Sequence, residues 1–196
     1  RRAALIQDQL PKARIAPTKF PSPLPNISLG AWMLLDSNTI LCSPRTSSPF
    51  PSGIPQFEEI REGPPGRAYL KLWEILTLIG KHPQPGDCCL ELGASPGGWT
   101  WALTSLGCTV KAIDRSPLAP NLMNHPQIQF IKGDAFSLKP ESIGQIDWLF
   151  CDVICYPEKL YDWLQPILVA NICKNFVCTL KFQGADNYAI TQKFKE

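Results

Sequence analysis

From residue 67 onward, short apolar runs alternate with longer segments whose apolar residues recur every three or four positions. The apolar runs cover residues 88–92, 109–113, 128–131, 146–151 and 175–180. Helical spacing marks residues 67–79, 99–106 and 158–173. Strands that alternate with helices run parallel when each helix serves as a crossover. The pattern therefore predicts an α/β fold with a doubly wound, mostly parallel, Rossmann-like sheet.

The N-terminal part of the chain has a different character, because eleven of the chain's 20 prolines lie at or before Pro65, nine of them within the first 60 residues. Proline at this density breaks helices and suits extended connectors. Residues 31–35 and 39–42 are apolar and flank the turn-like residues 36–38, which predicts a hairpin. Because two strands alone are marginally stable, we expect residues 1–60 to be a linker and the remnant of a further domain.

The predicted α/β domain covers residues 61–196 and contains five strands before the chain ends in a helical segment. We expect a sheet that is incomplete at its C-terminal end. No apolar run approaches the roughly 20 residues that cross a bilayer, so we expect no membrane segment.

Cysteine and charge usage exclude some classes of site. The eight cysteines form no Cys-x-x-Cys pair and mostly sit in apolar runs, so we expect buried thiols in a reducing cytoplasm and no metal site. A net charge of +2 does not by itself indicate nucleic-acid binding. Five basic residues against a single Asp8 in the first 25 positions could contact phosphates, or could be an ordinary solvated surface.

A glycine-rich turn follows the apolar run 88–92 and precedes a helical segment. It reads Glu91-Leu-Gly-Ala-Ser-Pro-Gly-Gly-Trp99. The next apolar run ends in Asp114, where a carboxylate can accept hydrogen bonds from a ribose, and a further acid, Asp134, follows the run after that. Such residues at successive strand ends converge on one crevice, which predicts a site for an adenosine-bearing ligand.

This turn is neither the dinucleotide fingerprint G-x-G-x-x-G nor a P-loop. It resembles the first motif of the S-adenosylmethionine-dependent methyltransferases, and its Pro-Gly-Gly-Trp form resembles the FtsJ-like ribose methyltransferases. The resemblance implies S-adenosylmethionine as cofactor, with Asp114 on the ribose and Asp134 on the adenine amino group. The predicted cofactor-binding set is Glu91, Gly93, Ala94, Pro96, Gly97, Gly98, Trp99, Asp114, Asp134 and Asp152.

Methyl transfer to a ribose hydroxyl requires alignment and a base that removes the hydroxyl proton. A lysine can serve as the base if burial or nearby positive charge lowers its pKa. Lys71 lies on the helical segment before the first strand, while Asp152 and Lys181 stand at strand ends that face the crevice. Each alone could be a solvated lysine or a strand terminator, but together they favour catalysis.

The FtsJ-like family uses a Lys-Asp-Lys-Glu tetrad in this order, and these three residues match its first three members. The fourth acid has no match, because Glu196 lies only 15 positions after Lys181. The resemblance therefore predicts Lys71, Asp152 and Lys181 as catalytic residues, in a chain that lacks the last member of the tetrad.

A closer resemblance, to the RlmM-like family, covers residues 46–188. It is carried by the segments 47–55, 61–72, 148–153 and 179–181 in their linked order. That family methylates a cytidine ribose in large-subunit ribosomal RNA and carries an RNA-binding THUMP domain before the catalytic domain. The resemblance implies ribosomal RNA as partner and a THUMP-like remnant within residues 1–60. The chain departs from the family at residues 154–156 and 183–186.

Two other functions compete with RNA ribose methylation. A non-catalytic module that binds RNA or the cofactor would retain the same fold. A methyltransferase acting on a base, a protein or a small molecule is disfavoured, because Asp152-Val153-Ile154 replaces the Asn/Asp-Pro-Pro-aromatic motif typical of enzymes that methylate exocyclic amines. The sequence leaves the modified nucleotide and the oligomeric state open.

Overall fold

The computed structural model describes residues 2–10, 16–24, 29–182 and 188–195. The segment 183–186 and Glu196 lie outside the described residues, as do three of the five basic residues near the N-terminus. Contacts divide the chain into two compact units. The first contains residues Arg1–Ile60 and Trp73–His82, and the second contains Arg61–Leu72 and Pro83–Glu196.

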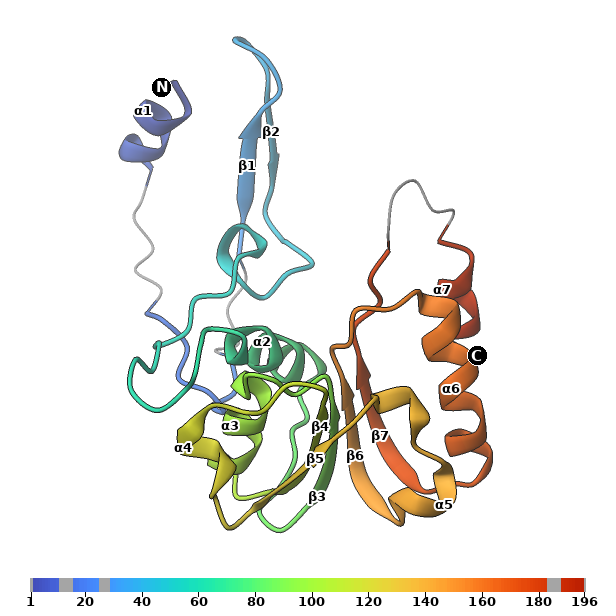
Figure 1. The fold of residues 1–196 in the computed structure, drawn as a ribbon. Helices are drawn as coiled ribbons and strands as arrows, with labels where there is room; N and C mark the ends of the chain where they lie inside the picture. The colour runs from blue at the N-terminus through green and yellow to red at the C-terminus, as the bar shows by residue number, and fades with distance from the viewer. Residues whose placement is uncertain (1, 11–15, 25–28, 183–187, 196) are drawn as a thin grey trace. The chain divides into compact units, whose positions relative to one another are not determined.

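The first unit contains helix α1 (Arg2–Gln9), the 3-10 turn η1 (Pro51–Gly53) and a hairpin (Figure 1). Strands β1 (Ala31–Leu34) and β2 (Ile40–Ser43) pair antiparallel, which confirms the predicted hairpin. Asp36 stabilises its turn, because one carboxylate oxygen accepts from the amides of Asn38 and Thr39 at 2.7 and 2.8 Å. The hairpin buries no residue, in contrast to the aromatic cluster of the same unit.

That cluster gathers Trp73, Phe20, Phe57 and Phe50. Trp73 stacks on Phe20 with ring centroids 5.0 Å apart, and Phe57 meets both Trp73 and Phe50 edge-on. Phe50, Phe57 and Trp73 are buried. Aromatic burial therefore holds the proline-rich segment of this unit to the second half of helix α2 (Tyr69–Ile79).

The second unit contains a sheet of five parallel strands (Figure 1). They are β3 (Cys88–Leu92), β4 (Thr109–Asp114), β5 (Ile128–Lys132), β6 (Ile146–Cys151) and β7 (Cys173–Cys178). Their order is β5-β4-β3-β6-β7, so the strand order reverses between β3 and β6. In such doubly wound sheets ligands bind at this reversal, outside the carboxyl ends of the strands. The predicted fold class is confirmed.

Helices connect the strands and cover the sheet. They are α3 (Gly98–Ser105), α4 (Pro120–Met123), the 3-10 turn η2 (Ala135–Ser137), α5 (Pro140–Ile143), α6 (Pro157–Val169) and α7 (Ile190–Lys193). On β6, Leu149 and Cys151 pack in one buried cluster with Leu160 and Leu164 of α6. The alternate residues Trp148 and Phe150 stack on each other, and Phe150 meets Trp99 of α3 edge-on. Both faces of the sheet are thus covered.

Two predicted boundaries were wrong. The predicted helix 158–173 ends at Val169, and Cys173 instead begins β7, because Asn171 adopts a left-handed conformation (φ 50°) that breaks the helix. Strand β7 ends at Cys178, three residues before Lys181. The C-terminal helix α7 ends at Lys193. The helices α4 and α5 have four residues each, too few for a periodicity to be recognised in the sequence.

Candidate active site

A cavity of about 560 Å³ opens at the carboxyl ends of β3, β4, β5 and β6. Most of its walls come from the last residues of these strands and the residues that follow them, and α6 and the segment after β7 contribute one lysine each. The lining residues are Gly93, Ser95, Ile113, Asp114, Arg115, Gly133, Asp134, Ala135, Phe136, Asp152, Val153, Ile154, Lys159 and Lys181. Of the twelve residues predicted for the site, Gly93, Asp114, Asp134, Asp152 and Lys181 line this cavity.

Gly93 follows β3 and allows the chain from β6 to approach closely. Its φ is +78°, and a Cβ at this position would lie 2.9 Å from Val153 Cγ2 and 3.2 Å from the Val153 nitrogen. The amides of Gly93 and Ala94 both donate to the carbonyl oxygen of Ile113. The turn is therefore tied to β4, and any larger residue at position 93 would push β3 and β6 apart.

Asp114 and Asp134 are fixed by backbone amides. The two carboxylate oxygens of Asp114 accept from Ser95 N at 3.0 Å and Ser116 N at 2.8 Å. Asp134 accepts from Phe136 N and forms an ion pair with Arg115. These bonds, with the Phe136 amide contributing most, hold the pKa of Asp134 below its ordinary value. Both acids are thus presented to the cavity in fixed orientations.

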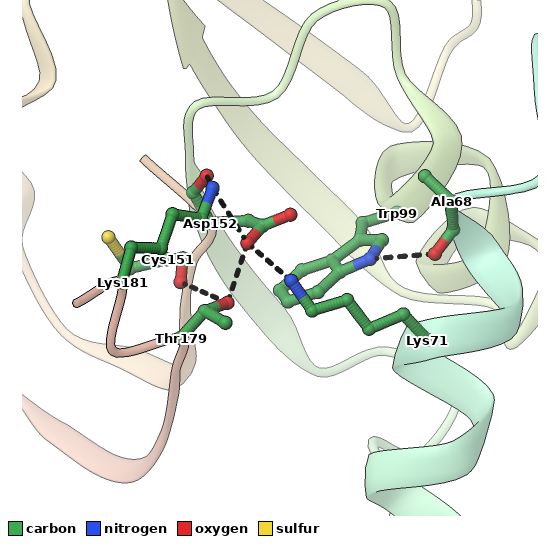
Figure 2. Close-up of polar contacts among 7 residues, drawn as sticks. All are labelled: Ala68, Lys71, Trp99, Cys151, Asp152, Thr179 and Lys181. Atoms are coloured by element: carbon green, nitrogen blue, oxygen red, sulfur yellow. Dashed lines mark hydrogen bonds and ion pairs between the residues drawn. The ribbon is translucent and has the colours of Figure 1, made fainter. Parts of the chain in front are cut away.

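The third acid of the crevice, Asp152, directly follows β6 and joins two lysines (Figure 2). Its Oδ1 lies 2.7 Å from Lys71 Nζ and 3.1 Å from Lys181 Nζ. Lys181 Nζ also donates to the Asp152 carbonyl oxygen at 2.5 Å. The three residues come from α2, the end of β6 and the segment after β7, and are 81 and 29 positions apart in the chain. The structure brings together the three residues that were predicted to be catalytic.

Thr179 also donates to Asp152 Oδ1, at 2.6 Å. Burial by itself raises the pKa of the Asp152 carboxyl, but the hydrogen bonds from Lys71, Thr179 and Lys181 outweigh it. The pKa of Asp152 therefore lies below its ordinary value, and the carboxyl is ionised at neutral pH.

Lys71 also lies over an aromatic ring. Its Nζ lies 5.6 Å from the ring centroid of Trp99, within the range of a cation–π interaction. The indole nitrogen of Trp99 donates to the Ala68 carbonyl oxygen at 3.0 Å, one turn before Lys71 (Figure 2). Trp99, predicted from the motif as a cofactor contact, is buried and supports a lysine here.

Glu91, also predicted as a cofactor residue, lies inside β3 and is buried. Its Oε2 accepts from Thr100 Oγ1 at 2.6 Å. Burial raises the pKa of Glu91 to about 8, although the hydrogen bond from Thr100 opposes this shift. Glu91 does not line the cavity, and its contact is with helix α3.

The remaining predicted cofactor residues are Ala94, Pro96, Gly97 and Gly98, and none is a lining residue of the cavity. Gly97 has a φ of +110°, and a Cβ there would collide with Leu122 of α4. A Cβ on Gly98 would lie 2.9 Å from the Ala68 Cβ. These two glycines allow close packing at the start of α3.

Sequence reasoning missed Thr179, Arg115 and Lys159. A signal for Thr179 was present, because residues two apart on an extended segment share a face, and Thr179 lies two positions before Lys181. Arg115 adjoins Asp114 in the sequence, but its ion pair with Asp134 depends on the pairing of β4 with β5. Lys159 reaches the cavity from α6, with its Nζ 4.5 Å from the ring centroid of Phe136. No pattern in the sequence indicated this position.

The chain was compared with protein families and with curated proteins. The model of the family described as FtsJ-like methyltransferase matches residues 65–183, more than half of the chain. A Halorhodospira halophila protein named ribosomal RNA large subunit methyltransferase M is 44% identical over 114 residues, covering 57% of this chain and 33% of that protein.

Proteins with the same name from other bacteria match a longer part of the chain. The Xylella fastidiosa protein is 34% identical over 161 residues, covering 78% of this chain and 45% of the relative. The Pseudomonas paraeruginosa protein is 32% identical over 159 residues, covering 78% and 44%. The chain therefore spans less than half the length of these relatives.

Among solved structures, one from Streptococcus thermophilus described as a candidate hemolysin superposes with a TM-score of 0.53. It is 22% identical and covers 63% of this chain and 46% of its own, so the likeness concerns the fold alone. Within the described residues, no helix is both long and apolar enough to cross a bilayer. The same residues contain no group of three or more His, Cys, Asp or Glu that could hold a metal ion.

Proposed function

The chain belongs to the FtsJ-like methyltransferase family, and on this premise we propose that it methylates a ribose 2′-hydroxyl of RNA with S-adenosylmethionine as donor. One observation carries the proposal: Lys71 and Lys181 both form ion pairs with one carboxylate oxygen of Asp152, which lines the same cavity as Gly93. The relatives named for the large ribosomal subunit favour its RNA as the substrate. We also propose a cytoplasmic location, where ribosomal RNA is found.

The residues of the cavity fit S-adenosylmethionine. Asp114 keeps free lone pairs on both oxygens, since each accepts one described amide bond, and these can accept the ribose hydroxyls. Asp134, at the end of the neighbouring strand, can accept from the adenine amino group once Arg115 moves aside. Gly93 leaves room over the backbone at the β3–β6 reversal for the methionine part. These three positions follow adjacent strands, as an extended ligand would require.

When bound, S-adenosylmethionine would supply an electrophilic methyl group to the ribose oxygen and would leave as a neutral thioether. The hydroxyl proton leaves to Lys181 Nζ, which lines the cavity and must be neutral at that moment. Asp152 orients Lys181 through both its carbonyl and its carboxylate, and Lys71 stabilises the carboxylate on its other side.

We further propose that residues 1–60 are the remnant of a THUMP-like RNA-binding domain with its linker, and that residues 61–196 are the catalytic domain. The exposed apolar residues of the hairpin, among them Met33, Leu35 and Leu41, support this interpretation. An isolated two-stranded sheet with exposed apolar side chains is marginally stable in water.

The decisive experiment is methyl transfer to large-subunit ribosomal RNA transcribed in vitro and therefore unmodified. A 2′-O-methyl group protects the adjacent phosphodiester from alkali, so protection at one nucleotide distinguishes ribose methylation from base methylation. Replacing Lys181 with Met should reduce transfer about 10²- to 10⁴-fold, the usual contribution of a general base. Lys174→Met, on the preceding strand β7, is the matched control and should leave transfer unchanged.

Calorimetry with S-adenosylmethionine separates binding from transfer. We expect Lys181→Met to bind the cofactor like the wild type, and Asp114→Asn to bind it more weakly. Undiminished transfer by Lys181→Met would remove Lys181 as the base. Cofactor binding by the wild type without transfer to any ribosomal RNA would instead support a non-catalytic module.

A further inference from the structure

We propose that Thr179 is a positioning residue, whose hydroxyl fixes the Asp152 carboxylate so that this carboxylate can hold Lys71 and Lys181 in place (Figure 2). The effect on catalysis rests on the proposed function, but the positioning itself does not. Thr179 acts through Asp152 and is not itself a lining residue of the cavity.

Three donors converge on a single oxygen. Asp152 Oδ1 lies 2.6 Å from Thr179 Oγ1, 2.7 Å from Lys71 Nζ and 3.1 Å from Lys181 Nζ. The bond from Thr179 is the shortest of the three. Since each donor comes from a different direction, their common acceptor is held against rotation of the carboxylate.

The Thr179 hydroxyl donates its proton to Asp152 Oδ1. The other acceptor near Oγ1 is the Cys151 carbonyl oxygen, at the longer distance of 3.3 Å. That carbonyl already accepts from the backbone nitrogen of Thr179 at 2.9 Å. A hydroxyl has one proton to donate, so the shorter and charge-assisted bond to Asp152 receives it.

Thr179 is the stiff member of the cluster. The parallel register pairs Cys151 with Cys178, so the next step along both strands sets Asp152 beside Thr179. A β-branched side chain has few accessible χ1 rotamers, whereas each lysine amine ends a flexible stem that loses substantial rotamer entropy when fixed. The hydroxyl therefore locates the carboxylate, and the carboxylate locates the two amines.

Loss of the hydroxyl should loosen this arrangement without emptying the space. In Thr179→Val the side-chain shape is retained, but Asp152 keeps only the two mobile lysine donors. The ionised carboxylate then loses a hydrogen bond, so the pKa of Asp152 should rise. Lys181 should no longer be held at the distance and angle that proton removal needs.

The test compares Thr179→Val with Thr179→Ser, which keeps the hydroxyl. We expect the Val variant to lose about 10- to 100-fold in kcat, the range for one bond to a charged group. Its KM for ribosomal RNA and its Kd for S-adenosylmethionine should stay near the wild-type values. Thr179→Ser should restore most of kcat.

A matched control and a second readout make the test independent of activity. Thr109→Val, at the start of β4, removes an exposed threonine hydroxyl remote from Asp152 and should leave kcat unchanged. Carboxyl ¹³C NMR should find the pKa of Asp152 raised in Thr179→Val and returned in Thr179→Ser. An unchanged Asp152 pKa in the Val variant, or a Ser variant as impaired as Val, would overturn the proposal. Absence of methyl transfer in the wild type would contradict the proposed function alone, because the NMR titration still decides the role of Thr179.

Discussion

Strands β6 and β7 carry one lysine–aspartate pair at each end, and the two pairs differ in surroundings. At the amino end Lys174 Nζ lies 3.0 Å from Asp147, and at the carboxyl end Lys181 Nζ lies 3.1 Å from Asp152. The side chain of Lys174 is 76% exposed, whereas that of Lys181 is 28% exposed. Similar distances thus occur in very different solvent environments.

The two pairs also differ in the other hydrogen-bond donors that each carboxylate accepts from. Asp147 accepts from the backbone nitrogen of Cys88, a bond that ties β6 to the start of β3. Asp152 instead accepts from three side chains, one on α2 and two on the segment after β7, and it lines a cavity. The comparison teaches that an ion pair at a strand end points to function when several side chains share its carboxylate and a cavity adjoins it. Four predictions test this distinction.

The largest effect is expected from exchanging one aspartate for asparagine at each end. Asp152→Asn removes the charge that both lysines share, so we expect methyl transfer to fall about 10²- to 10⁴-fold. Asp147→Asn removes a charge of the same kind from the amino end and should leave transfer within a factor of about 2 of the wild type. Initial rates on ribosomal RNA measure both, with circular dichroism as the check on folding. Equal losses in the two variants would break the comparison.

A second prediction concerns Glu91 of β3, the strand that lies between β4 and β6. In the folded protein the pKa of Glu91 is about 8, above the ordinary 4.5. The neutral Glu91 carboxyl therefore makes its full contribution to the free energy of unfolding below pH 4.5, and this contribution is lost as the pH rises to about 8. Glu91→Gln cannot ionise, so it should be more stable than the wild type at pH 9, by on the order of a few kcal/mol.

Urea unfolding between pH 5 and pH 9 measures this difference. Glu62 is exposed, so Glu62→Gln serves as the control. Its free energy of unfolding should change with pH as that of the wild type does. If the free energy of unfolding of Glu91→Gln had the same pH dependence as the wild type, Glu91 would be ionised in the folded protein. Glu91 would then carry a charge, as Asp152 does after β6.

A third prediction tests the aromatic support of Lys71. Trp99→Phe keeps a ring but offers a weaker cation–π face and loses the indole donor to Ala68. We expect kcat to fall about 2- to 5-fold, corresponding to a partly exposed cation–π contact. Trp148→Phe changes the other tryptophan that contacts Phe150 and should leave kcat at the wild-type value. The same kcat in both variants would mean that Trp99 only fills the core.

The smallest effect is expected at Lys174. Because this pair is exposed, Lys174→Met should shift Tm by less than about 2 °C, and added salt should remove the difference. Differential scanning calorimetry at low and high ionic strength measures it. A large shift that persists in high salt would show that the amino-end pair is as important to the protein as the pair at the carboxyl end.

Much of the α/β unit was predictable because its signals are local. Apolar runs of four to six residues located all five strands, and the glycine-rich turn lies between a strand and a helix as predicted. The strand reversal next to it was not predicted. The end of α6 was missed because apolar residues continue through Cys173 into β7, where helix and strand share the same composition. The positions of Lys71, Asp152 and Lys181 were predicted from motif resemblance, but their common acceptor atom was not.

The sequence by itself determined the order of strands and helices along the chain and which acids lie at or just after strand ends, since hydrophobic periodicity and glycine conformations are properties of neighbouring residues. Only the tertiary structure decided that Glu91 points into the core, that Trp99 supports Lys71, and that Thr179 meets Asp152. These contacts join residues that the parallel register brings together from distant parts of the chain. Burial raises the pKa of Glu91 while shared hydrogen bonds lower that of Asp152, so two neighbouring acids are shifted in opposite directions, an outcome that no local pattern encodes.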